Sequence, residues 1–119
     1  MKFSVDKQEN VIVYEILEDK LTSVNAPILK SELVMANTEG YKNIIIDLDK
    51  VRFVDSSGLS AILVGNRICT EYDGTFALCG LNDIVKNLIK ISQLDDVLNI
   101  FSTQFDALQA INNTTENID

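Results

Sequence analysis

The chain of 119 residues contains no histidine. Histidine is the side chain that most often acts as the general base for a serine nucleophile, so a histidine-dependent serine hydrolase is excluded. The nucleophile pattern Gly-x-Ser-x-Gly is also missing around Ser56 and Ser57. A lysine base is left open, and Lys50 and Lys20 are the nearest candidates in the sequence. We therefore expect a protein without catalytic activity of its own.

Basic residues are scarce. Ten lysines and arginines stand against eighteen aspartates and glutamates, which gives a formal net charge of −8. Binding to nucleic acid without sequence preference depends on basic patches that contact phosphates, and docking on an anionic membrane depends on similar patches. We therefore expect neither nucleic acid nor a membrane surface as a direct partner, and we expect other proteins instead.

Long apolar runs are missing as well. Stretches such as Ala61-Ile62-Leu63-Val64 are far shorter than the roughly 20 residues that a membrane-spanning helix needs. The first residues, Met1 to Asp6, lack the pattern of a targeting segment, so we expect a cytoplasmic protein. The length fits one domain. We place this domain at 1–111 and expect the polar residues 112–119 to form a flexible tail.

Cysteine and glycine are few. Cys69 and Cys79 are the only cysteines, and without histidine neighbours they match no metal-binding spacing, so we expect buried free thiols. A glycine-rich phosphate loop ending in Gly-Lys-Ser or Gly-Lys-Thr is absent, and so are the three spaced glycines of dinucleotide-binding folds. The sequence thus predicts neither a resident metal nor a nucleotide cofactor.

Apolar spacing predicts an α/β fold. Three consecutive isoleucines, Ile44 to Ile46, indicate a central strand that is buried on both faces. The expected strands are 3–6, 11–17, 43–48, 75–79 and 98–101, and the expected helices are 25–37, 57–72, 82–91 and 103–111. Strands alternate with helices after the first hairpin. We therefore expect a mixed β-sheet of about five strands covered by about four α-helices.

The helix expected at 25–37 carries two further predictions. Ser23 or Asn25 is suited to cap its first turn. Its apolar stripe at helical spacing is predicted to consist of Ile28, Leu29, Leu33, Val34 and Met35.

The most informative stretch runs from Asp47 to Leu59. The apolar strand expected at 43–48 leads into an acidic loop. Asp55, Ser56 and Ser57 follow at the start of the amphipathic helix expected at 57–72. Backbone N–H groups at a helix start have no partner within the helix, and the helix dipole is positive there. A phosphate attached to one of these hydroxyls would be stabilised at this place. We therefore interpret Ser56 as a residue that is modified.

Two other interpretations apply to the same stretch. Asp47, Asp49 and Asp55 lie near a strand end, where paired carboxylates hold Mg²⁺ in phospho-aspartate signalling. Alternatively, Asp-Ser-Ser-Gly is an ordinary helix N-terminus, with Asp55 or Ser56 as the cap and Gly58 in the first turn. Taken alone, these four residues favour plain capping.

The residues around this motif resemble a known family, the STAS domains of bacterial anti-sigma factor antagonists. The resemblance covers nearly the whole chain, and the segments that carry it are 21–23, 44–48, 51–59, 76–81 and 88–94. It implies the STAS fold and a regulatory protein without catalytic activity. It also implies that Ser56 is phosphorylated by a partner that is both an anti-sigma factor and a serine kinase. The unmodified form would bind this kinase and release a sigma factor.

The same resemblance implies a second partner, a metal-dependent serine phosphatase that resets the switch, so that ATP and Mg²⁺ belong to the partners. Asp55, Ser57, Gly58 and Leu59 surround the expected phosphorylation site. Many members of the family carry an aspartate at the position of Thr22. The alternative within this fold is a scaffold or transport-accessory STAS domain that has no phosphorylation cycle.

The helix after the motif is expected to carry the partner surface. At 100° per residue an apolar arc faces the core, and its members are Leu59, Ala61, Ile62, Leu63, Ile68 and Cys69. Ser60, Val64 and Arg67 lie opposite this arc. A valine in a polar strip is often an ordinary surface residue; the alternative that we expect here is that Val64 anchors a partner, with Ser60 and Arg67 at the rim. Thr22 and Ser23 are expected to lie near Ser56 and to join this surface, because loops at one sheet edge gather there.

Overall fold

The isoleucine run forms the centre of the sheet. It lies in β4 (Asn43–Asp47), which pairs with β2 (Val11–Ile16) on one side and β6 (Phe76–Cys79) on the other. Ile44, Ile45 and Ile46 are all fully buried. The predicted central strand, buried on both faces, is therefore confirmed.

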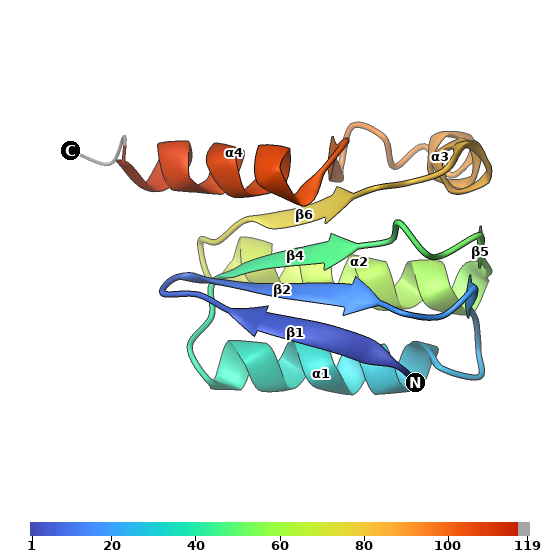
Figure 1. Ribbon diagram of the computed structural model, residues 1–119, viewed down its shortest axis with the longest axis horizontal. Coiled ribbons are helices and arrows are strands. Elements are labelled where there is room, and N and C mark those ends of the chain that lie inside the picture. Colours follow the sequence, from blue (N-terminus) through green and yellow to red (C-terminus); the bar gives the residue numbers. More distant parts are fainter. Residues whose placement is uncertain (117–119) are drawn as a thin grey trace.

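In the computed structural model, which describes residues 1–116, this sheet has five strands in the order β1-β2-β4-β6-β7 (Figure 1). β1 (Phe3–Lys7) runs antiparallel to β2, and the remaining neighbours are parallel, with β7 (Asn99–Phe101) at the far edge. The sheet is thus mixed, as predicted. Its parallel part brings the carboxyl ends of β2, β4 and β6 to the same end of the molecule, where the loops that concern function begin.

Four helices cover the two faces, as expected. α1 (Ala26–Thr38) and α2 (Ser56–Glu71) lie side by side on one face, and α4 (Gln104–Glu116) lies on the other (Figure 1). α3 (Asp83–Ile91) contributes Val85 and Ile89 to the larger core under α1 and α2. The alternation of side chains along β4 explains the two cores: Ile44 and Ile46 join the larger one, and Ile45 joins the smaller one under α4.

Two very short strands were not predicted. β3 (Lys20–Leu21) and β5 (Phe53–Val54) pair in parallel as a separate two-stranded sheet. Strands of two residues are too short to show any periodicity in the sequence. The pair matters for function because it fixes the loop before α1 beside the first turn of α2.

The predicted apolar stripe of α1 is corrected by the structure. Its buried residues are Ala26, Leu29, Leu33 and Ala36. Ile28, Val34 and Met35 are instead 41%, 50% and 54% exposed. Neighbouring apolar residues point about 100° apart on a helix, so the five predicted positions do not share one buried face. Small alanines fill that face because α1 packs closely against its surroundings.

The last helix differs from its prediction at its end. α4 continues to Glu116, beyond the expected end at Ile111, so 112–116 belong to the helix and the boundary placed at 111 marks no change of structure. Differences in helix propensity among ordinary residues stay below about 1 kcal/mol each, so polar residues extend a helix whose buried side is already anchored. The rest of the predicted tail, 117–119, lies outside the described residues.

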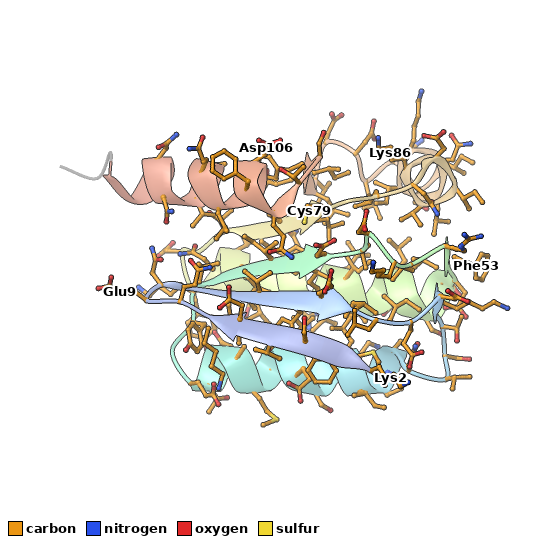
Figure 2. All side chains as sticks on the ribbon, in the orientation of Figure 1. Lys2, Glu9, Phe53, Cys79, Lys86 and Asp106 are labelled. Atoms are coloured by element: carbon orange, nitrogen blue, oxygen red, sulfur yellow. The ribbon has the colours of Figure 1, made fainter. Side chains whose placement is uncertain are left out.

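Both cysteines are free and buried, as predicted. Burial raises the pKa of the Cys69 thiol to about 12, and burial, with the nearby carboxylates of Asp47 and Asp49, raises the pKa of Cys79 to about 12. Cys79 lies at the end of β6 (Figure 2) and belongs to the core under α4. At neutral pH both thiols are therefore protonated and shielded.

Within residues 1–116, no helix is both long enough and apolar enough to span a bilayer.

Candidate functional site

The first turn of α2 is built around Asp55. Helix α2 begins at Ser56, one residue earlier than expected, and Asp55 is its N-cap with extended backbone angles (φ −95°, ψ −174°). One carboxylate oxygen of Asp55, Oδ1, accepts a hydrogen bond from the N–H of Gly58 at 2.9 Å. The capping interpretation is therefore correct for Asp55. It leaves Ser56, as the first helical residue, without a capping duty.

The second oxygen of Asp55 fastens the neighbouring loop. Oδ2 accepts a hydrogen bond from the N–H of Ser23 at 3.2 Å, and the Asp55 N–H donates to the carbonyl of Leu21 at 3.1 Å. These two bonds hold the loop before α1 against the start of α2. Ser23 and Ser56 line one pocket as a result, which confirms the expectation that they lie near each other.

The loop itself is organised by Asn25 and not by a helix cap. The Asn25 side chain accepts from the Thr22 N–H at 2.8 Å and donates to the carbonyl of Lys20 at 2.8 Å. Asn25 occupies the N-cap position of α1 but makes no side-chain capping bond, and Ser23 uses its N–H on Asp55. The predicted cap position is therefore correct for Asn25, but its side chain makes no capping bond to α1. Thr22 lines a neighbouring hollow with Lys20 and Val24, beside the pocket of Ser56.

Gly58 is required by packing. A Cβ atom at this position would lie 2.3 Å from the carbonyl oxygen of Leu21 and 2.9 Å from Cγ1 of Val54. The first of these is a backbone atom, which has little freedom to move. The glycine of the motif therefore lets α2 approach the β3–β5 pair closely, and its role is structural. Leu59 beside it packs against the larger core.

Ser56 faces an open pocket of about 290 Å³ between the two helices. One wall comes from the loop and α1 and the other from α2; the lining residues are Ser23, Ala26, Pro27, Lys30, Ser56, Ser57 and Ser60. Ser56 is exposed and Ser57 is half-buried. Within the described part of the chain, no hydrogen bond engages the Ser56 hydroxyl. This hydroxyl is therefore free and reachable from outside.

The expected partner surface continues along α2 from this pocket. Ser60 and Arg67 are exposed, and Val64 is half-buried without joining either core. Most of the opposite arc faces inward: Ala61, Ile62 and Cys69 are buried, and Leu59 and Leu63 pack against the core. Ile68, also predicted to belong to this arc, is half-buried and joins neither core. Of these three residues, Ser60 also lines the pocket of Ser56 between α1 and α2.

The three aspartates of the motif region do not form one site. Asp47 is only 7% exposed, and its carboxylate accepts bonds from the Asp49 N–H at 2.9 Å and from Gln104 Nε2 of α4 at 2.7 Å. Asp55 instead caps α2, on the other side of the sheet. Over residues 1–116, no three acidic, cysteine or histidine side chains are grouped to hold a metal ion. Asp47 and Asp49 line one small pocket without Asp55, so the three aspartates of the phospho-aspartate interpretation are not brought together.

The lysines near the motif are not where the sequence suggested. Lys50 and Lys20 line two other hollows, whereas Lys30 of α1 lines the pocket of Ser56. No hydrogen bond joins Lys30 to Ser56 in the described residues, as a serine–lysine nucleophile would need. Sequence reasoning missed Lys30. The available signal was its helical spacing from Ala26, which puts both on the side of α1 that faces α2.

Comparison with known proteins identifies relatives of this arrangement. The sequence profile of the STAS domain matches residues 2–107. BtrV of Bordetella bronchiseptica, which is named as an anti-sigma factor antagonist, is 27% identical over 77% of this chain and 78% of its own length. An anti-sigma F factor antagonist of Paenibacillus polymyxa is 31% identical over 56% of this chain and 57% of its own length.

Solved structures show the same fold. An anti-sigma-factor antagonist (STAS) domain protein from Planctomyces limnophilus superimposes with a TM-score of 0.83 at 24% identity, over 92% of this chain and 97% of its own. The unphosphorylated anti-sigma factor antagonist SpoIIAA gives 0.75 at 18% identity, over 93% and 98%. A sulfate transporter family protein from Wolinella succinogenes gives 0.79 at 22% identity, over 91% and 89%. The fold therefore occurs both in regulators and in transport proteins.

Proposed function

The chain belongs to the STAS domain family, and on this premise we propose that it is an anti-sigma factor antagonist switched by phosphorylation of Ser56. One observation carries the proposal: the Ser56 hydroxyl is exposed, engages no hydrogen bond within residues 1–116, and stands first in α2 while Asp55 does the capping. The names of the relatives BtrV and the Paenibacillus protein support the antagonist role. SpoIIAA, which shares the fold, has been solved in a phosphorylated form as well.

The proposed partner is an anti-sigma factor that is also a serine kinase. In the transfer, a bond forms between Ser56 Oγ and the γ-phosphorus of ATP, and the bond from that phosphorus to the ADP oxygen breaks. The hydroxyl proton passes to a base of the kinase, and ADP leaves. A metal-dependent phosphatase would reverse the state by hydrolysis, which returns the hydroxyl and releases inorganic phosphate. This chain supplies the hydroxyl and its position.

Charge explains how the modification would switch binding. A phosphoserine adds about −1.5 to −2 charges and three strong acceptor oxygens. The proposed contact surface begins beside this hydroxyl, with Ser60 on α2 and Ser23 on the loop in the same pocket. It extends to Thr22 on the loop and to Val64 and Arg67 further along α2. Burying a phosphate in an interface shaped for a neutral hydroxyl costs several kcal/mol of binding free energy. Each loss of about 1.4 kcal/mol weakens the affinity about tenfold.

The domain would accept the phosphate without unfolding. Ser56 stands at the positive end of the α2 dipole, where negative charge is stabilising by about 0.3–1 kcal/mol. The side-chain bonds that join the loop to the start of α2 run through Asp55, whose carboxylate accepts from the N–H groups of Gly58 and Ser23. The effect of phosphorylation is therefore felt by the partner and hardly by the fold.

Binding measurements with the cognate kinase test the proposal. We expect Ser56→Ala to bind as tightly as the unmodified protein, and Ser56→Asp to bind at least about a hundredfold more weakly. Ser4→Asp, on the exposed strand β1, is the matched control for an added carboxylate and should bind normally. Equal affinities of the two Ser56 variants would contradict the switch.

Mass spectrometry tests the site itself. Incubation with the kinase and ATP is expected to add one phosphate, on Ser56. Modification of Ser57 or Thr22 in its place would overturn the assignment.

A second candidate function is a scaffold or transport-accessory domain that does not switch. The transporter-family structure from Wolinella succinogenes, which has the same fold, favours it. Such a domain would bind its partner equally well as Ser56→Ala and as Ser56→Asp, and no kinase would modify it. The binding comparison above therefore separates the two functions.

A further inference from the structure

Lys30 is the one charged residue that lines the pocket of Ser56 in the described chain. It is half-buried in the second turn of α1, on the side that faces the first turn of α2. It has no carboxylate partner: within residues 1–116 the single ion pair is Lys7 with Glu39, at 3.3 Å. A cation without a carboxylate partner in the described structure thus lines the same pocket as the hydroxyl.

We propose that the Lys30 ammonium binds the phosphate on Ser56 within the same molecule. The inference rests on the proposed phosphorylation of Ser56, and it adds the position that the phosphate takes in the folded domain. Attached to Ser56, the phosphate would turn into the pocket and lie in the groove between α1 and α2. Its oxygens would accept from the Lys30 ammonium and from the hydroxyls of Ser57 and Ser60.

The chemistry of the pocket suits a phosphate better than a neutral group. A lysine ammonium offers three donors on a flexible stem, and a phosphate offers several acceptor oxygens. Three serine hydroxyls besides Ser56 line the same pocket, and hydroxyls adjust their donors to the oxygens they meet. The other wall residues, Ala26 and Pro27, are small or rigid and leave the space open.

Two charged side chains decide the local balance. Asp55 precedes Ser56 and repels a phosphate, but both of its oxygens already accept backbone N–H groups. Lys30 attracts the phosphate across the pocket and has no competing carboxylate. A nearby positive charge favours the doubly ionised phosphate, so Lys30 lowers the second pKa of phosphoserine below its usual value near 6.

Phosphorus NMR on protein that carries phosphoserine at position 56, incorporated during translation, tests this inference without the kinase. We expect Lys30→Gln to raise the second pKa of the phosphate by about 0.5, a roughly threefold change in proton affinity, because one neighbouring cation is lost. Lys30→Arg should keep the low value. Lys20→Gln is the matched control, since Lys20 lies in the adjacent hollow and should leave the phosphate pKa unchanged.

The outcomes are separable. An equal phosphate pKa in the Lys30→Gln variant and the unsubstituted protein would overturn the role of Lys30, even with Ser56 established as the kinase's target. Equal shifts for Lys30→Gln and Lys20→Gln would also overturn it, because the effect would then be one of overall charge. Failure of the kinase to modify Ser56 would instead overturn the proposed function, whatever the NMR titration shows.

Discussion

The first turns of α2 and α3 are built on the same plan. Both follow a cap residue with extended backbone, Asp55 before α2 and Asn82 before α3. In each case the cap side chain accepts a hydrogen bond from the N–H three residues on, at 2.9 Å from Gly58 and at 2.8 Å from Val85. The two helix starts therefore satisfy their backbone in the same way.

They differ in the residue directly after the cap. In α3 this is Asp83, an exposed carboxylate that permanently complements the positive end of the helix. In α2 it is Ser56, which is exposed and neutral, and the first turn contains no acidic residue. The same position thus holds a fixed charge in one helix and a hydroxyl in the other. What makes the α2 site special is the hydroxyl and its pocket, since the capping geometry is common to both.

The largest expected difference between the two turns is at the third residue. Gly58→Ala would push a methyl group against the Leu21 carbonyl oxygen, and we expect the free energy of unfolding to fall by about 3 kcal/mol. Urea denaturation followed by circular dichroism measures this. Ser60→Ala, exposed on the same helix, is the control and should change it little. A Gly58→Ala protein of unchanged stability would mean that the helix start is not held against β3.

Exchanging the two cap residues, Asp55 and Asn82, for each other's type should lower the stability of the fold, although both make the same capping bond. Asn82 also donates to the carbonyls of Val51 at 3.3 Å and Arg52 at 3.2 Å, whereas the second oxygen of Asp55 accepts from Ser23. Asp55→Asn and Asn82→Asp would each keep the capping bond and lose this second interaction, at about 1 kcal/mol each.

Thermal or urea denaturation of the two exchange variants checks this, with Asn87→Asp on the exposed side of α3 as the control for the change of charge. Exchange without loss of stability would show that capping is all these residues do. The two helix starts would then differ only in the residue after the cap, Ser56 in α2 and Asp83 in α3.

The smallest expected effect concerns those first residues. Asp83→Ala removes a charge that favours the helix dipole, so we expect a loss of about 0.5 kcal/mol at low salt that fades as salt screens it. Ser56→Ala removes a hydroxyl without an internal partner and should change stability less, with no dependence on salt. Denaturation at low and high ionic strength separates the two. A large loss on Ser56→Ala would indicate a structural role for this serine.

Local patterns predicted the framework of the molecule well. The isoleucine run of β4, the hairpin of β1 and β2, and the start of α2 within one residue all follow from periodicity and capping chemistry, which act over short distances. The order of elements and the mixed sheet followed from these. The place of Ser56 at the start of a helix was also expected, because it depends on the same local patterns.

Features that depend on contacts across the chain were not predictable in this way. The β3–β5 pair joins residues that no repeat pattern connects, and Lys30 reaches the Ser56 pocket only because α1 packs beside α2. Asn25 looked like a cap, yet its side chain bonds within the loop. In each case the outcome was decided by tertiary neighbours, which propensities do not describe.

Asp55 divides its two oxygens between Gly58 and Ser23 and shares neither with the hydroxyl beside it. A chemical change at Ser56 therefore breaks no internal bond, and the phosphorylated domain would be no easier to degrade than the unmodified one. How many copies a cell holds and what fraction is modified would then be set independently. A circuit built on this chain would change its output within one enzymatic turnover per molecule, while synthesis and degradation continue unchanged.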